Sequence, residues 1–265
     1  MSEKPPVNGR DPWSGLRAYT PARIALGRAG TSLPTRPHLD FQLAHAQART
    51  AVHAALDVAQ LAARLEPLGL EVLPLASAAA SRAEYLQRPD KGRRLDDASR
   101  AALAAREASE MAPEVVLVIG DGLSARAIEE NAAPFLSVMV SALRDADWRI
   151  GPLAIVTQAR VAIGDEIGAG LDAAMVVVLI GERPGLSSPD SLGLYLTAAP
   201  RVGLTDEARN CISNVRAAGL SHAAAAHKLL FLMTEARRRG VSGVTLKDEA
   251  EALAEDTPRR NFLLP

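Results

Sequence analysis

Residues 115–125 read VVLVIGDGLSA, an apolar and largely β-branched run that ends in a glycine turn. Such a run is typical of a strand that is buried on both faces of a parallel sheet. Gly120 and Gly122 permit a tight turn directly after the run, and Ser124 is a favoured N-cap for a following helix. The stretch therefore predicts a strand–turn–helix unit of an α/β fold.

Similar apolar runs follow along the chain, and helical segments lie between the early ones. The predicted strands are residues 150–156, 175–180 and 192–197, and the predicted helices are residues 124–146, 164–171 and 221–239. Strands that alternate with helices indicate βαβ units. We therefore expect a Rossmann-like, mostly parallel sheet with helices on both faces, formed by residues 113–265.

The chain before residue 113 has a different pattern. Residues 1–19 are rich in proline, glycine and charge, and they predict a disordered tail. Residues 20–112 predict a helical region with helices at 20–30, 39–65, 81–86 and 96–111. A short strand at residues 71–75 is expected at a sheet edge, because Pro74 cannot donate a hydrogen bond in a central strand.

The composition argues against several classes of protein. The 30 basic and 31 acidic side chains give a net charge of −1, and aromatic residues are only 3%, so we expect no nucleic-acid partner. The single cysteine excludes an internal disulfide and fits a reducing, cytoplasmic location. No run reaches the roughly 18 apolar residues of a membrane span, so no membrane partner is expected either.

The segment Gly120–Ala125 also matches the loose pattern G-x-G-x-x-A of dinucleotide sites. That pattern requires an acidic residue after the second strand, but Asp145 and Asp147 precede it. A tight turn is therefore the favoured interpretation, and a stand-alone nucleotide-binding protein is the alternative hypothesis. None of the five histidines has the spacing of a metal site.

Loops at the carboxyl ends of parallel strands line the ligand crevice of an open sheet. The loops after all four predicted strands qualify, including the one after Thr197. The charged or reactive residues on this rim are Asp121, Arg160, Glu182 and Arg183, with Cys211 just beyond the fourth strand. They include no nucleophile with a base and an orienting group, so the rim predicts a binding half-site.

Several blocks in order resemble one family, the small (light) subunits of adenosylcobalamin-dependent ethanolamine ammonia-lyases. The resemblance runs from about residue 22 to about residue 219. Its carriers are residues 23–30 (RIALGRAG), 85–95 (YLQRPDKGRRL), 121–124 (DGLS), 160–161 (RV), 181–186 (GERPGL), 191–192 (SL) and 210–214 (NCISN).

The resemblance implies that this chain binds the corrin of base-on adenosylcobalamin against a large TIM-barrel subunit. That large subunit would bind ethanolamine and convert it to acetaldehyde and ammonia, so we expect no catalytic residue in this chain. The family's cofactor positions correspond here to Val161, Glu182 and Cys211, and Arg160 is a further candidate as a donor to a corrin carbonyl. An Asp-x-His-x-x-Gly motif, which displaces the cofactor's own base in other cobalamin proteins, is absent.

Some relatives carry a long N-terminal extension that directs the enzyme to a bacterial microcompartment. The residues before Arg23 are few and not amphipathic, which favours a free cytoplasmic complex. We also expect the helix that begins at Leu39 and the basic loop at residues 91–94 to help dock the large subunit.

Overall fold

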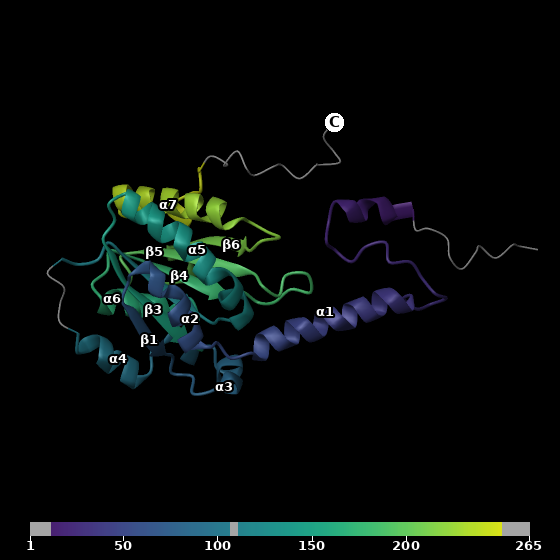
Figure 1. The fold of residues 1–265 in the computed structure, drawn as a ribbon, viewed down its shortest axis with the longest axis horizontal. Coiled ribbons are helices and arrows are strands. Elements are labelled where there is room, and N and C mark those ends of the chain that lie inside the picture. The colour runs from purple at the N-terminus through teal and green to yellow at the C-terminus, as the bar shows by residue number, and fades with distance from the viewer. Residues whose placement is uncertain (1–11, 107–110, 251–265) are drawn as a thin grey trace, which may run out of the picture.

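The computed structural model describes residues 12–106 and 111–250, and its centre is a 6-stranded sheet (Figure 1). The strands lie in the order β1-β3-β2-β4-β5-β6. They span β1 (Val72–Ala76), β2 (Val115–Gly120), β3 (Ile150–Thr157), β4 (Met175–Gly181), β5 (Leu192–Ala198) and β6 (Arg209–Val215). The first four strands in this order are parallel, whereas β5 is antiparallel to both of its neighbours.

Helices cover both faces of the sheet (Figure 1). The α-helices of the described residues are α1 (Thr35–His53), α2 (Val58–Leu65), α3 (Arg82–Gln87), α4 (Asp97–Ala104), α5 (Ala125–Asp145), α6 (Ile163–Gly170) and α7 (His222–Arg239). α2, α5 and α7 pack on one face, and α4 and α6 pack on the other. This confirms the predicted α/β fold with a mostly parallel sheet.

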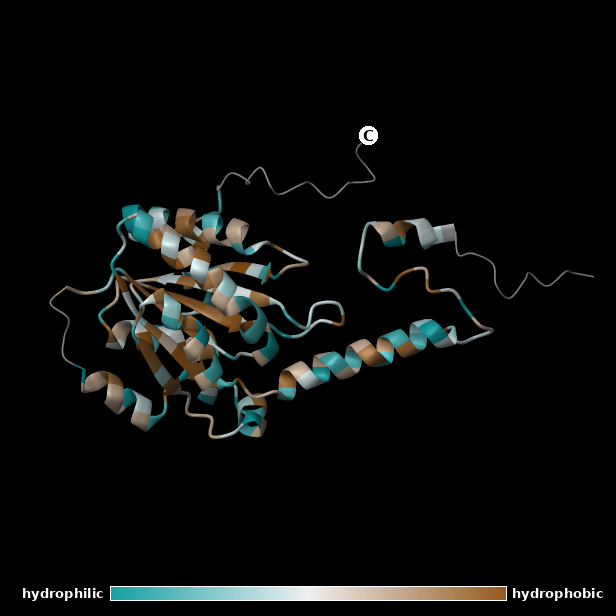
Figure 2. Cartoon of the chain, viewed as in Figure 1, coloured by the Kyte–Doolittle hydropathy of each residue, from teal (hydrophilic) through white to brown (hydrophobic). Residues whose placement is uncertain are grey.

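The central strands explain the apolar runs in the sequence. Every residue of β2 and β4 is buried, because helices cover these strands from both sides. Alternate side chains contribute to two separate apolar clusters, one on each face, and the strands are the most hydrophobic segments in Figure 2. Ser124 caps α5 as expected, since its hydroxyl accepts a hydrogen bond from the backbone N–H of Ala127.

The far half of the sheet differs from the prediction. The fourth predicted strand, β5, runs antiparallel to β4, because residues 182–191 are too few for a parallel crossover, which needs about a dozen or more residues. β6 was not predicted at all. Its sequence, RNCISNV, is polar at most positions because one side of this edge strand is largely exposed.

Three expected helices also differ from the structure. Residues 21–28 form no helix, because Ala25 and Gly27 adopt left-handed backbone conformations. The helix predicted at 39–65 is interrupted, since Ala54 is extended and the Asp57 carboxylate caps α2 by accepting from the N–H of Gln60. The helix predicted to reach residue 111 ends at Ala104, although Asp96 caps its start as expected.

The N-terminal part extends away from the sheet. Within the predicted disordered tail, Pro12–Ala18 form a 3-10 helix, and residues 1–11 lie outside the described part of the chain. α1 projects outward from the α/β layers, and residues 12–34 fold back beside it (Figure 1). None of the described helices is long and apolar enough to cross a membrane.

β1 occupies one edge of the sheet, as Pro74 predicts. Glu71 and Ser77 both form backbone hydrogen bonds with the β3 region, which places the odd-numbered residues of this segment toward β3. The nitrogen of Pro74 therefore faces away from the sheet. β1 and α2 thus belong to the sheet and its helical cover, although both come before residue 113, where the α/β region was predicted to begin.

A buried ion pair ties α6 to the far edge of the sheet. The Arg209 guanidinium donates to both carboxylate oxygens of Asp165, at 2.8 and 2.9 Å, and both side chains are almost fully buried. Thr197 and the carbonyl of Leu204 accept further hydrogen bonds from Arg209. Because both charged groups are removed from water, each is stabilised mainly by the opposite charge of its partner.

We expect Arg209→Met to lower the free energy of unfolding by about 3–5 kcal/mol, because it leaves the Asp165 charge buried without its partner. The double variant Arg209→Met with Asp165→Leu should be less destabilised than the single variant, since it removes both charges. Urea denaturation of the three proteins measures the difference. Equal stability of the single and double variants would contradict the role assigned to this pair.

Candidate functional site

The candidate site lies at the edge of the sheet where the parallel strands end. β1, β2, β3 and β4 finish there, and β6 finishes there too because it runs in the same direction as β4. The loop after β5 was expected on this rim, but the antiparallel direction of β5 places it at the opposite edge. The rim is therefore formed by the turns after β1, β2, β3, β4 and β6.

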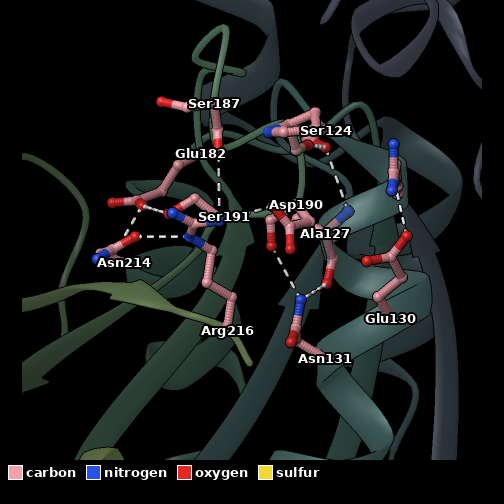
Figure 3. Close-up of polar contacts among 12 residues, drawn as sticks. Ser124, Ala127, Glu130, Asn131, Glu182, Ser187, Asp190, Ser191, Asn214 and Arg216 are labelled. Atoms are coloured by element: carbon pink, nitrogen blue, oxygen red, sulfur yellow. Dashed lines mark hydrogen bonds and ion pairs between the residues drawn. The ribbon is translucent and has the colours of Figure 1, made fainter. Parts of the chain in front are cut away.

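Glu182 stands at the end of β4 and is held by the neighbouring strands (Figure 3). Its backbone N–H donates to the carbonyl of Ser191 at 2.9 Å. Its Oε2 accepts from the Ser191 hydroxyl and from the N–H of Asn214 at 3.2 Å. Oε1 takes no donor from the described residues, so one oxygen of a fixed carboxylate is available to a ligand.

Polar contacts also hold the loop between β4 and β5 (Figure 3). The Ser124 hydroxyl donates to the carbonyl of Pro189 at 2.7 Å, and the Asn131 amide donates to that of Asp190 at 2.9 Å. Arg216 pairs with the Asp190 carboxylate at 3.3 Å and donates to the Asn214 side chain at 2.8 Å. The loop is thus fixed to both α5 and the end of β6.

Cys211 lies in β6, directly opposite Tyr195 in β5. The thiol is free and Cys211 is exposed. A Cβ on the neighbouring Gly193 would come within 3.1 Å of both the Glu182 and Tyr195 side chains, which places these two groups on one face of the strands. Cys211 follows the fourth predicted strand, as expected, but it lies within a further strand, β6, that was not predicted.

The surroundings of Cys211 keep its thiol protonated. Desolvation is the main cause that raises the pKa of Cys211, and the nearby negative charge of Glu182 raises it further. Desolvation also raises the pKa of Tyr195, and its contact with Cys211 acts in the same direction. Glu182, Tyr195 and Cys211 therefore form a patch that presents a carboxylate, a neutral phenol and a neutral thiol.

Arg160 and Val161 lie apart from this patch, after β3. The β3 strand is separated from β4 by β2, so the two strand ends are about 10 Å apart. The guanidinium of Arg160 stacks on the Tyr85 ring at 4.3 Å from its centroid. Val161 is half-buried and packs against the apolar cluster beneath α4 and α6.

The glycine turn at residues 120–125 has no room for a nucleotide. The N–H of Leu123 already donates to the carbonyl of Gly181 at 2.8 Å, and that of Ser124 donates to Asp121. A Cβ on Gly122 would lie 2.2 Å from the Gly181 oxygen, so the turn packs directly against the end of β4. These contacts favour the tight-turn interpretation over the nucleotide-binding alternative.

Asp121 has an internal role at this turn. Its buried carboxylate accepts from the N–H of Ala159 at 3.0 Å and lies 3.5 Å from the Arg82 guanidinium. Desolvation by burial raises its pKa, while these donors oppose the shift. Asp121 therefore joins the ends of β2 and β3 rather than facing a ligand.

Several residues of the candidate site carry no signal in the sequence that predicts their role from the residues alone. Ser191 and Asn214 fix Glu182, and both lie in blocks that carry the family resemblance, which is the signal that could have identified them. Tyr195 and Gly193 carry no such signal, because only the strand pairing brings them beside Glu182 and Cys211. No group of three or more histidine, cysteine or acidic side chains arranged for a metal occurs in the part of the chain that the structure describes.

Known proteins resemble this chain over almost its whole length. A family model for the ethanolamine ammonia-lyase light chain (EutC) matches residues 10–247. The chain is 57% identical over 263 residues to the ethanolamine ammonia-lyase small subunit of Ralstonia nicotianae, an alignment that covers 99% of this chain and 97% of that one. It is 56% identical over 268 residues to the protein of the same name from Xanthomonas campestris pv. campestris, with 98% of both chains covered.

We expect iodoacetamide to alkylate Cys211 slowly at neutral pH, with a half-maximal rate at a higher pH than for an ordinary cysteine, because desolvation and Glu182 raise the pKa of the thiol. Glu182→Gln should lower this midpoint, since it removes a neighbouring negative charge. Mass spectrometry across a pH series measures both rates, and Cys211 is the only cysteine of the chain. A rate that has already reached its plateau at pH 7 would disprove the prediction.

Proposed function

The chain belongs to the ethanolamine ammonia-lyase small-subunit family, and we propose that it binds the corrin of adenosylcobalamin at the interface with a large TIM-barrel subunit. The observation that carries the proposal is Glu182, a carboxylate fixed at a strand end with one oxygen unpaired by the described residues. In this arrangement the large subunit binds ethanolamine and releases acetaldehyde and ammonia.

The polar groups of the rim fit the edge of a corrin. A corrin carries amide side chains, which offer N–H donors and carbonyl acceptors. Glu182 Oε1 can accept from an amide N–H, a charge-assisted hydrogen bond of the stronger kind. Arg160 offers the complementary chemistry, because its guanidinium can donate to an amide carbonyl.

The small residues of the rim fit the flat part of the same group. Gly193 has no side chain, and Cys211 and Val161 have short ones, so a planar macrocycle can approach the strands closely. The raised pKa of Cys211 favours a neutral thiol that packs against the macrocycle rather than an anionic ligand for cobalt. Together with the absence of an Asp-x-His-x-x-Gly motif, this supports a base-on cofactor.

The chemistry is divided between the subunits. Adenosylcobalamin, when bound, supplies the radical that removes a hydrogen atom from the substrate. The groups that this chain offers on the rim bind, orient and shield the cofactor, since they include no base aligned with a nucleophile. We therefore assign Val161, Glu182, Cys211 and Arg160 to cofactor binding and no residue of this chain to catalysis.

α1 is the proposed contact with the large subunit. Its apolar side chains Leu39, Phe41 and Leu43 are exposed, and only Ala44 and Ala51 are buried. Helices in proteins are stabilised mainly by the packing of their apolar side chains, so the exposed apolar side chains of α1 favour a packing partner there. The basic loop at residues 91–94 is proposed as a second contact; within it Lys91 pairs with Glu84 and Arg94 pairs with Glu166.

Glu182→Ala is expected to weaken the affinity of the two-subunit complex for adenosylcobalamin by roughly 10–100-fold, through loss of a charge-assisted hydrogen bond. Spectroscopic titration of the purified complex measures the dissociation constant. Glu207→Ala is the matched control, because Glu207 is exposed and precedes β6, at the opposite edge of the sheet. Equal affinities of the wild type and Glu182→Ala would remove Glu182 from the site.

The isolated chain should produce no acetaldehyde from ethanolamine, even with adenosylcobalamin present, because its rim lacks catalytic groups. Adding the large subunit should restore activity. A coupled alcohol dehydrogenase assay on the separate and mixed subunits measures this. Acetaldehyde production by the pure small subunit would overturn the proposed division between the chains.

A further inference from the structure

Tyr85 lies at the centre of an unusual cluster below the rim. It belongs to α3, is fully buried, and has two guanidinium groups against its ring. The Cζ of Arg160 is 4.3 Å from the ring centroid, and that of Arg82 is 4.7 Å from it. The Tyr85 hydroxyl donates to the carbonyl of Ala159 at 3.0 Å. Burial raises the pKa of Tyr85 to about 12, so the phenol keeps its proton at neutral pH.

The two arginines of this cluster differ in their hydrogen bonds. Arg82 donates to the carbonyls of Val52 and Gly122, and it also lies near the Asp121 carboxylate. Arg160 has no hydrogen-bond acceptor or ion-pair partner for its guanidinium among residues 12–106 and 111–250. Its Nε is buried and unpaired, which is an unfavourable state for a donor. Nη2 of Arg82 is also buried and unpaired, but the other nitrogens of Arg82 donate within the chain, which gives it a structural role. The Arg160 guanidinium has no acceptor at all among the described residues.

The backbone is shaped to hold Arg160 in this position. The N–H of Arg160 donates to the carbonyl of Gly92 at 2.7 Å. A Cβ on Gly92 would lie 2.9 Å from both the Cγ of Arg160 and the Cε2 of Tyr85. A larger residue at position 92 would therefore push the two stacked groups apart. Stacking on an aromatic ring orients a guanidinium while leaving its outer N–H groups able to donate in the plane of the guanidinium itself.

We infer that Tyr85 is a positioning residue, which holds the Arg160 guanidinium as a donor to an oxygen acceptor of the bound cofactor. The inference rests on the proposed function, since it concerns the same rim. The acceptor is either a side-chain amide carbonyl of the corrin or a phosphate oxygen of its nucleotide loop. Gly92 assists Tyr85, because it leaves the space that the stack occupies.

The test is adenosylcobalamin titration of the purified two-subunit complex, with binding rather than turnover as the readout. Arg160→Met should weaken affinity about tenfold by removing the donor. Tyr85→Leu should cause a similar loss, and Tyr85→Phe should recover most of it because the ring remains. Arg149→Met, at the opposite edge of the sheet, is the control that should bind like the wild type.

The decisive measurement is the double variant Tyr85→Leu with Arg160→Met. If Tyr85 acts through Arg160, the double variant binds no more weakly than Arg160→Met alone. Additive losses would overturn the positioning role, as would a loss in Tyr85→Phe equal to that in Tyr85→Leu. If Tyr85→Leu fails to assemble with the large subunit, Gly92→Ala disturbs the same stack, and its loss should likewise disappear in the Arg160→Met background.

Failure of this inference is separable from failure of the proposed function. A wild-type complex that does not bind adenosylcobalamin contradicts both. A wild type that binds, with Glu182→Ala weakened and Arg160→Met unchanged, overturns only the inference. Repeating the titrations in increasing KCl identifies the acceptor, because the ratio of wild-type to Arg160→Met affinity falls with salt for a phosphate and stays constant for an amide carbonyl.

Discussion

The close contact between the ends of β2 and β4 controls the rest of the candidate site. A Cβ on Gly181 would lie 2.1 Å from the carbonyl oxygen of Ser124, and one on Gly122 would approach the Gly181 oxygen equally closely. Backbone therefore packs on backbone, with no space for a phosphate between the two turns. Arg160 and Glu182, the two charged residues proposed to contact the corrin, lie on either side of this closed centre.

Much of the fold was predictable because buried segments have a recognisable pattern of apolar residues in the sequence. The fully buried strands β2 and β4 appear as uninterrupted apolar runs, and Ser124 and Asp96 mark helix starts through side-chain caps. The direction of β5 was not predicted, since an apolar strand looks the same in either direction. The prediction of a helix at residues 20–30 was wrong because tertiary contacts determine the conformation of that segment. One such contact is the hydrogen bond from Arg23 to the carbonyl of Leu186.

The site was predictable in the same uneven way. The strand-end rule and the family resemblance both led to Glu182, because charge directly after a buried strand is visible in a sequence. Glu182 is held by Ser191, in the loop before β5, and by Asn214, in β6. No local sequence pattern predicts that these residues lie beside Glu182. Tyr85 was also missed as part of the rim, since a buried aromatic residue in a short helix normally indicates only core packing.

The position of Pro74 limits how the molecule can associate. Pro74 is exposed in the outermost strand, and its nitrogen faces outward without a hydrogen to donate. A second extended chain cannot complete a ladder beside β1, so fibril-like growth along this border is blocked. A subunit made ahead of its partner can therefore accumulate without templating cross-β aggregation from that strand.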